Sequence, residues 1–331
     1  MNLRSSRAMS SFLLAALGVL PSLALGGREA PAGTVLRLGA LKGPTGIGMV
    51  RVFEVPPKLA AGDSLELQTV PSADAMAAKL VAGELDAAVL PVNLAAKLYA
   101  SGLPFRLAAV VGMGMVSVVT TDPEVRSFED LRGREVHVAG QGATPEYLIR
   151  TIAEARGLDP DKDLTLAFRL PYPEIAASLV AGRISLAVLP EPFATQALAG
   201  NPRARVPFPL DQLWREATGR PGYPMSVLVI RDSLIRDRPT IVRALLGAYA
   251  DSIAWVKANP AEAGALVEKY DLGLKAAVAA AAIPRSAYVF LPAPEARADV
   301  EALLSVFLTI EPKSIGGRLP DPGFYAEIPK R

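Results

Sequence analysis

Cysteine is absent from the 331-residue chain, and histidine occurs once, as His137. Without cysteine there are no disulfides, thiol nucleophiles or thiolate metal sites. A single histidine excludes histidine-rich metal sites and leaves histidine-dependent acid–base chemistry with one residue. His137 falls inside an expected strand, where a packed side chain is the commoner role. We therefore predict no catalytic residues, no metal ligands and no cofactor.

The chain also lacks an excess of charge of either sign. Lys and Arg number 35, and Asp and Glu number 33. This balance does not favour a surface for nucleic acid or for anionic membranes, so neither is an expected partner. Hydrophobic residues make up 51% of the chain, which is ample for a packed core. At roughly 150 residues per domain, the length allows about two domains.

The first 26 residues have the three parts of a secretory signal peptide. Arg4 and Arg7 give the positive start, and an apolar run follows at 12–25. A small-x-small pattern at 24–26 marks a cleavage site. An uncleaved membrane anchor is the alternative, but the apolar run is short for a bilayer span.

Cleavage after Gly26 predicts an exported protein, most simply one in a periplasm. No cysteine follows the cleavage site, so a lipid anchor is excluded and the mature protein is expected to be soluble. Residues 27–33 are expected to form a loose leader. Without Arg4 and Arg7, the chain has 33 basic and 33 acidic residues, so its net charge is zero.

Short apolar runs alternate with helical patterns along the chain. This order predicts an α/β fold with parallel strands and right-handed crossovers. Strands are expected at 35–41, 65–70, 87–90, 105–111, 136–139, 165–169, 186–189 and 226–230. Helices are expected from residue 49, at 74–82, from about 93 to 98, at 145–156 and 174–181, after residue 190, and at 239–257, 261–268 and 295–309. The tail at 311–331 is rich in proline and glycine, and we expect it to lie extended on the surface.

A repeat with an offset of 99 residues divides this alternation into two halves. Residues 80–95 read LVAGELDAAVLPVNLA, and residues 179–194 read LVAGRISLAVLPEPFA. Nine of the sixteen positions are identical without a gap. The repeat predicts two similar α/β lobes, because an offset near one hundred is too long for a solenoid.

The lobes are expected to be joined by two chain crossings, one near residues 117–122 and a return near 223–230. We assign 34–119 together with 230–331 to the first lobe and 120–229 to the second. In open parallel sheets, ligands bind beyond the carboxyl ends of the strands. Two such edges facing each other predict a cleft that closes about a hinge on a ligand.

Five candidate ligand-binding residues follow strands of the first lobe: Lys42, Thr45, Gly46, Ser72 and Asn93. The glycine-containing loop after residue 41 lets backbone N–H groups and Lys42 hold an oxygen of a ligand. A tight turn with a solvated lysine is the alternative. Ser72 begins a helix, so capping is its leading role.

The second lobe and the return crossing supply the other candidates: Gln141, Thr144, Tyr172, Glu191, Tyr223 and Met225. Thr144 either contacts a ligand or caps its helix, and both roles are compatible. Tyr172 either stacks on a flat ligand or packs in the core. Glu191 either accepts hydrogen bonds from a ligand or stabilises its own helix N-terminus. Tyr223 and Met225 flank the return crossing and are expected on the cleft floor.

Several segments resemble the type II periplasmic substrate-binding proteins of ABC importers. They are LKGPTGIG (41–48), LVAGELDAAVLP (80–91), SFEDLRGREVHVAGQGATPEYLI (127–149), AVLPEPFA (187–194) and IPRSAYVF (283–290). The resemblance is to the group that binds alkanesulfonates, taurine, nitrate and thiamine-pyrimidine precursors. It implies a monomeric protein that captures a small molecule between its lobes and delivers it to an ABC permease in the inner membrane.

Two other functions are compatible with the same fold. One is an enzyme, such as a menaquinone-pathway dehydratase or a pyrimidine synthase, which the signal peptide and the lack of a nucleophile–base pair disfavour. The other is a periplasmic sensor or adaptor. The candidate loops contain no arginine, which favours a larger, partly apolar or aromatic ligand over a small, strongly charged anion. The sequence does not identify the ligand.

Overall fold

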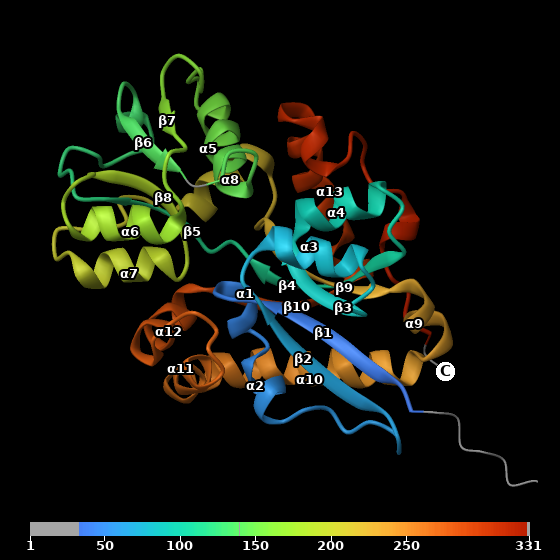
Figure 1. The fold of residues 1–331 in the computed structure, drawn as a ribbon. Helices are drawn as coiled ribbons and strands as arrows, with labels where there is room; N and C mark the ends of the chain where they lie inside the picture. The colour runs from blue at the N-terminus through green and yellow to red at the C-terminus, as the bar shows by residue number, and fades with distance from the viewer. Residues whose placement is uncertain (1–32, 139, 330–331) are drawn as a thin grey trace, which may run out of the picture. The chain divides into compact units, whose positions relative to one another are not determined.

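The computed structural model describes residues 33–138 and 140–329, and this part of the chain contains two β-sheets (Figure 1). The first sheet has six strands in the order β10-β4-β9-β3-β1-β2, and the second has four in the order β5-β8-β6-β7. The first comprises β1 (Val35–Leu41), β2 (Ser64–Val70), β3 (Ala87–Pro91), β4 (Phe105–Met113), β9 (Pro224–Arg231) and β10 (Ala287–Pro292). The second comprises β5 (Val116–Thr120), β6 (Glu135–Val138), β7 (Thr165–Ala167) and β8 (Leu186–Pro190). The expected signal peptide and most of the leader lie outside the described residues.

Helices surround both sheets, which confirms the α/β fold class with two lobes. Figure 1 shows α6 and α7 side by side next to the second sheet and α10 along the first. The α-helices are α1 (Pro44–Ile47), α2 (Val50–Glu54), α3 (Ala73–Val81), α4 (Val92–Ala100), α5 (Thr144–Ala155), α6 (Tyr172–Val180), α7 (Phe193–Gly200), α8 (Leu210–Thr218), α9 (Asp232–Asp237), α10 (Pro239–Ala258), α11 (Pro260–Lys269), α12 (Ala276–Ala282) and α13 (Ala293–Ile310). The 3₁₀ helices are η1 (Glu129–Leu131), η2 (Ile283–Arg285), η3 (Pro312–Ile315) and η4 (Pro322–Phe324).

The sequence repeat is a structural repeat. Helix α3 and strand β3 correspond to α6 and β8 with the same offset of 99 residues at every boundary. Gly83 and Gly182 follow the two helices with φ angles of 73° and 67°, a left-handed conformation that glycine adopts without strain. In each lobe the repeated strand pairs in parallel with one neighbour (β1 or β6) and antiparallel with the other (β9 or β5).

The chain changes sheet earlier than the expected lobe boundaries at 119/120 and 229/230. Strand β4 ends in the first sheet at Met113, and β5 opens in the second at Val116. Gly114 and Met115 between them have φ angles of 64° and 75°, which redirect the backbone sharply. The return is complete by Pro224, because the whole of β9 belongs to the first sheet. Apolar residues continue from β4 through Met115 into β5, so hydrophobic patterning alone does not mark this change of sheet.

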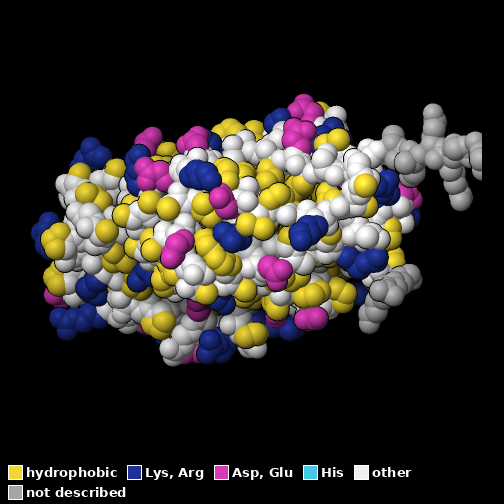
Figure 2. Space-filling model, turned by 90° about the horizontal axis from the view of Figure 1, so that it is seen from below, with side chains coloured by type: hydrophobic (Ala, Val, Ile, Leu, Met, Phe, Trp, Pro, Cys, Tyr) yellow, Lys and Arg dark blue, Asp and Glu magenta, His cyan; other side chains and the backbone are white. Residues whose placement is uncertain are grey.

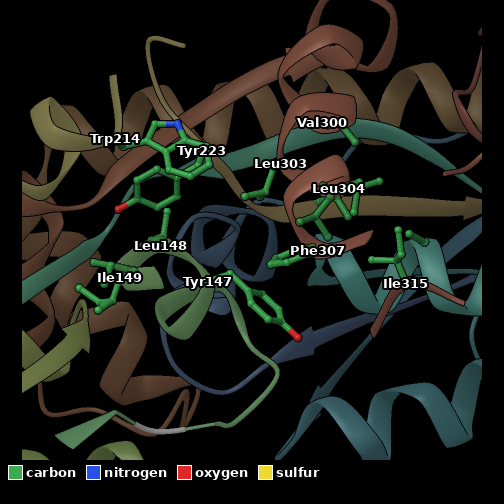
Figure 3. Packing of buried hydrophobic residues seen from close by; sticks show 14 of the residues in the cluster. Tyr147, Leu148, Ile149, Trp214, Tyr223, Val300, Leu303, Leu304, Phe307 and Ile315 are labelled. Atoms are coloured by element: carbon green, nitrogen blue, oxygen red, sulfur yellow. The ribbon is translucent and has the colours of Figure 1, made fainter. Parts of the chain in front are cut away.

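One apolar cluster extends across elements of both lobes. Tyr147 of α5 meets Phe307 of α13 with ring centroids 4.6 Å apart, in an edge-on arrangement (Figure 3). Trp214 of α8 is 1% exposed and packs edge-on against Tyr223, with centroids 5.6 Å apart. The first contact joins α5 to the C-terminal helix α13, and the second joins α8 to the return crossing.

The tail at 311–331 does not lie wholly on the surface, which corrects the sequence expectation. Ile315 and Phe324 are fully buried, and Tyr325 is 5% exposed. The Ala326 N–H donates a hydrogen bond of 2.8 Å to the Leu107 carbonyl of β4. Proline and glycine set the irregular path of this segment, while a few widely spaced apolar residues hold it against the protein.

Charged side chains of both signs alternate on the face of the molecule that Figure 2 shows. Basic and acidic groups there are interspersed with apolar side chains, and neither sign gathers into one patch on that face. In the described part of the chain, no helix is both long enough and apolar enough to cross a bilayer.

Candidate functional site

The first-lobe loop after β1 is tied to the segment that follows α11. The Lys42 N–H donates to the Val70 carbonyl at 3.0 Å, and the Gly43 N–H donates to the Leu272 carbonyl at 2.8 Å. The Lys42 ammonium forms an ion pair with Asp271, whose side chain is 82% exposed. Because Asp271 is so exposed, the pair is weak, and the Lys42 ammonium stays available to a ligand.

Gly46 has a packing reason to be glycine. A Cβ at this position would lie 2.6 Å from the Leu41 carbonyl oxygen and 3.3 Å from the Leu272 side chain. The neighbouring Thr45 hydroxyl donates to the same Leu41 carbonyl at 3.4 Å. The close approach at Gly46 is therefore between parts of the chain, and a role in ligand contact stays a prediction.

Ser72 and Asn93 begin helices of the first lobe in different ways. The Ser72 hydroxyl accepts a hydrogen bond of 3.2 Å from the Ala75 N–H, so Ser72 caps α3 as expected. Asn93 lies in the first turn of α4 and is partly exposed. Among the described residues nothing forms a hydrogen bond with the Asn93 amide, so this amide is available to a ligand.

A buried carboxylate holds the second-lobe loop that contains Gln141. Glu146 is 4% exposed, and its two oxygens accept from the Gly142 N–H at 2.7 Å and from Arg150 Nε at 2.8 Å. The capping role considered for Thr144 is not observed, because Ala143 occupies the N-cap position and Thr144 is the first helical residue. Sequence reasoning missed Glu146, although a glutamate in the first turn of a helix with arginine four residues later is a recognisable signal.

Gln141 and Gly142 line a pocket of about 560 Å³. The α5 helix contributes Glu146, Tyr147 and Arg150 to its wall, and the end of α13 contributes Ile310 and Glu311. Gln141 is exposed, so its amide is accessible from this pocket.

Tyr172 opens α6 and stacks on Phe193 of α7, with ring centroids 5.6 Å apart and an interplanar angle of 19°. Burial raises the pKa of Tyr172 to about 12. A Cβ at Gly140 would lie 3.9 Å from the Tyr172 hydroxyl oxygen, so this tyrosine adjoins the Gln141 loop. The aromatic pair satisfies the packing role, and contact of Tyr172 with a ligand stays a prediction.

Glu191 is the most buried of the charged candidates, at 1% exposed. Its Oε2 accepts from the Thr195 N–H of α7 at 3.1 Å, which is the helix-stabilising role. Its Oε1 accepts from Arg285 Nε at 2.8 Å. Glu191 follows β8 of the second sheet, and Arg285 precedes β10 of the first, so this ion pair joins the two lobes.

Arg285 lies outside the candidate loops, and sequence reasoning missed its contact with Glu191. It lies in the segment IPRSAYVF, which carries the family resemblance, but no local pattern connects it with Glu191 94 residues away. Nearby, burial raises the pKa of Tyr288 well above its ordinary value, and the Glu191 charge acts in the same direction.

Tyr223 and Met225 lie at the return crossing. Tyr223 is fully buried, and burial together with the Asp211 carboxylate holds its pKa well above the ordinary value. Met225 is partly buried against both large apolar clusters. Tyr223 packs as part of the core, and contact of either residue with a ligand stays a prediction.

A family comparison agrees with this two-lobe geometry. The model of the NMT1-like family matches residues 57–269, which is more than half of the chain. The chain belongs to the NMT1-like family. No curated protein matches this NMT1-like chain in sequence.

Solved structures show the same fold. An ABC transporter structure from Parabacteroides distasonis is 28% identical, with a TM-score of 0.74 over 89% of this chain and 99% of that one. The periplasmic aliphatic sulphonate-binding protein SsuA from Escherichia coli is 19% identical, with a TM-score of 0.68 over 88% and 93%. The periplasmic nitrate-binding protein NrtA from Synechocystis PCC 6803 is 16% identical, with a TM-score of 0.60 over 86% and 85%. The NMT1-like chain therefore has the fold of the periplasmic binding proteins of ABC importers, as the sequence resemblance implied.

The lone histidine of this NMT1-like protein lies in β6, one residue before the end of that strand. His137 pairs with Ala187 of β8, and its side chain is 12% exposed. His137 Nε2 is 3.5 Å from a Glu135 carboxylate oxygen. Within residues 33–138 and 140–329, no group of three or more His, Cys, Asp and Glu side chains is arranged to hold a metal ion.

Proposed function

We propose that this NMT1-like protein is the ligand-binding component of an ABC importer. In this proposal it captures a small organic molecule between its two lobes and delivers the molecule to a permease in the inner membrane. The protein acts as a monomer in a periplasm, and it carries no catalytic residues.

The observation that carries the proposal is the ion pair between Arg285 and the buried carboxylate of Glu191, which joins the two sheets. Glu191 follows β8, the strand of the repeated unit, so it stands where ligands bind in parallel sheets. A charged contact that depends on the relative position of two lobes is suited to link ligand capture with lobe closure. Family membership and the fold of the solved neighbours support the same function.

We place the hinge at Gly114 and Tyr223, where the two crossings meet. The Gly114 N–H donates to the Tyr223 carbonyl at 3.0 Å. Rotation about these two crossing segments would change the distance between Glu191 and Arg285, and each sheet would stay intact. The candidate residues Lys42, Asn93, Gln141 and Tyr172 belong to different lobes, so closure would bring their loops to one ligand.

The proposal is tested by a ligand screen on the mature protein with two readouts. Thermal unfolding finds ligands, because a ligand present at a hundred times its dissociation constant stabilises the folded state by about 2.7 kcal/mol. Small-angle X-ray scattering then measures closure, and mass spectrometry of the recovered ligand measures turnover. We expect a smaller radius of gyration and an unchanged ligand.

Two results would replace the proposal by one of the alternatives. Chemical conversion of the ligand would make this protein an enzyme on the same fold. Closure without transfer to a permease in reconstituted membrane vesicles would favour a sensor or an adaptor.

A further inference from the structure

We infer that the second lobe has a further binding pocket, outside the interlobe cleft, that takes a small molecule with a carboxylate group. The pocket has a volume of about 460 Å³, and its wall consists of Asp122, Arg134, Glu135, His137 and residues 182–186. Glu135 opens β6 and Leu186 opens β8, so the pocket lies at the amino ends of these parallel strands. The candidate residues Gln141 and Glu191 follow the carboxyl ends of the same strands, so the inference does not depend on the proposed function.

The sequence repeat supplies a counterpart of this pocket in the first lobe. With the offset of 99 residues, Ser185 stands at the position of Asp86. The Arg231 N–H donates to the Asp86 carbonyl at 2.8 Å, and the Thr121 N–H donates to the Ser185 carbonyl at 2.9 Å. The backbones of the two lobes therefore correspond at this point, and the side chains can be compared position by position.

In the first lobe, a carboxylate of the chain itself occupies this position. Asp86 accepts from Arg37 Nε at 2.9 Å and from Arg231 Nε at 3.3 Å. In the second lobe, the strand registers place Glu135 at the position of Arg37 and Thr121 at the position of Arg231. With Ser185 in place of Asp86, the second lobe lacks the central carboxylate, and Ser185 lines the pocket instead.

Guanidinium groups from other positions lie beside this pocket. A Cβ at Gly182 would lie 3.8 Å from Arg203 Nη2, and a Cβ at Gly83 would lie 4.0 Å from Arg231 Nη2. Arg203 thus holds a guanidinium beside the second-lobe glycine as Arg231 does beside its first-lobe counterpart. Arg183 lines the pocket, and its guanidinium makes one long hydrogen bond, of 3.4 Å, to Ser178 Oγ.

The charge balance of the pocket favours an anion. Its two acids are already paired, and the ion pairs are Asp122–Arg134 and Glu135–Arg169. Among residues 33–138 and 140–329, Arg183 and Arg203 have no acidic partner, so two positive charges stay uncompensated. A carboxylate offers two acceptor oxygens to such guanidinium groups, and the first lobe accommodates one at the same backbone position. A neutral or cationic molecule would leave both charges uncompensated.

The test uses His137 as a reporter, because it is the one histidine of the chain and lines this pocket. The proton NMR signals of its imidazole ring are followed in the mature protein at constant pH and ionic strength. The probes are malonate and succinate, each compared with its neutral diamide, and inorganic phosphate. We expect at least one dicarboxylate to shift the His137 signals to saturation, and its diamide to leave them unchanged.

Arginine variants assign the binding to the pocket. Arg183→Gln and Arg203→Gln are each expected to weaken binding of that dicarboxylate about tenfold or more, because each removes a charged hydrogen-bond donor. Arg215→Gln is the matched control, since Arg215 is an exposed arginine on α8 that does not line the pocket.

Ser185→Asp gives the second lobe the carboxylate that the first lobe has. We expect this variant to weaken the dicarboxylate about tenfold or more, because the new side chain repels it and competes for the same arginines. Ser64→Asp adds the same charge at an exposed position of β2 in the first lobe and is expected to keep the wild-type affinity. All five positions are read with the His137 signals, which every variant retains.

Three results would overturn the inference: no dicarboxylate shifts the His137 signals, the diamides bind as tightly as the acids, or Ser185→Asp and the two arginine variants keep the wild-type affinity. Tighter binding of phosphate than of either dicarboxylate would overturn the ligand class. Lys42→Ala is expected to leave the His137 response unchanged, and its loss in that variant would place the ligand in the cleft. Each of these results leaves the proposed function standing, because that function is tested by lobe closure.

Discussion

The ring of Tyr147 on α5 meets the ring of Phe307 on α13 edge-on, with centroids 4.6 Å apart, and both residues are at most 1% exposed. Helix α13 also reaches the segment after α8, because Arg220 lies 3.8 Å from Asp299. The C-terminal helix is thereby an apolar brace between parts of the chain that belong to different lobes.

Removal of one ring tests this brace. We expect Phe307→Ala to lower the free energy of unfolding by about 3–5 kcal/mol, as for other fully buried phenylalanines. Tyr147→Phe keeps the ring contact and removes only the hydroxyl, so its effect is expected to stay near about 1 kcal/mol. Urea unfolding measures both, and equal effects of the two variants would contradict the brace.

Gly46 and Gly247 give a matched prediction of how an added Cβ changes the stability of the protein. A Cβ at Gly46 would lie 2.6 Å from the Leu41 carbonyl oxygen, whereas Gly247 on the exposed side of α10 has nothing within 4 Å of such a Cβ. Gly247→Ala is expected to stabilise the protein by about 0.5–1 kcal/mol through helix propensity. Gly46→Ala is expected to destabilise it. Thermal unfolding of both variants tests the contrast, which fails if Gly46→Ala is neutral.

The Lys42 ammonium is expected to contribute to anion binding. Its partner Asp271 is 82% exposed, so water competes for that ion pair and the lysine is free to reorient. Lys42→Ala is expected to weaken binding of the tightest anionic ligand that the ligand screen finds tenfold or more. Lys162→Ala removes a lysine that pairs with Asp159 on the second lobe and serves as the control. Equal affinities of wild type and Lys42→Ala would remove Lys42 from the site.

The repeated unit was predictable from sequence because its boundaries carry local signals. Gly83 and Gly182 end helices in the left-handed conformation, and Pro91 and Pro190 end strands, so both units have the expected order at the expected offset. Strand β1 has the expected bounds because its apolar run is bordered by polar and glycine residues. Patterns of this kind depend only on neighbours in sequence.

The Glu191–Arg285 pair was not predictable in this way. Its members are 94 residues apart, and only the closure of two sheets against each other brings them together. For a related reason, the sequence places both crossings too far along the chain. The alternation of strands continues through Gly114, and the change of sheet there is decided by tertiary pairing.

Asp86 gives a prediction of pH dependence. Its oxygens accept from Arg37 Nε at 2.9 Å, from Arg37 Nη2 at 3.0 Å and from Arg231 Nε at 3.3 Å. Burial disfavours the ionised carboxylate, but the arginine contacts outweigh burial and hold the pKa of Asp86 below its ordinary value. A lowered pKa stabilises the folded state above the unfolded-state pKa of about 3.9, and this contribution is lost as the pH falls through the folded-state pKa.

Asp86→Asn is therefore expected to cost about 2–4 kcal/mol at pH 7. The difference from wild type is expected to shrink below about pH 4, because protonation of Asp86 then removes the same charge from wild type. Urea unfolding at pH 7, 4 and 3 measures it. Asp251→Asn, on an exposed position of α10, is the control and is expected to stay within about 0.5 kcal/mol. A difference that is constant with pH would contradict the assignment.

Substitution of Phe324 tests whether the C-terminal tail lies on the surface or is anchored to the protein. Its side chain is fully buried, and its ring lies 5.1 Å from Tyr99 and 5.2 Å from Tyr325 between centroids. Loss of a buried aromatic ring costs about 3–5 kcal/mol, whereas substitutions on an exposed tail stay within about 0.5 kcal/mol. Phe324→Ala is expected to show the larger effect in urea unfolding, and Leu319→Ala, at 37% exposed in the same segment, the smaller. Equal small effects would contradict an anchored tail, because a ring that contributes nothing to the free energy of unfolding does not hold the segment in place.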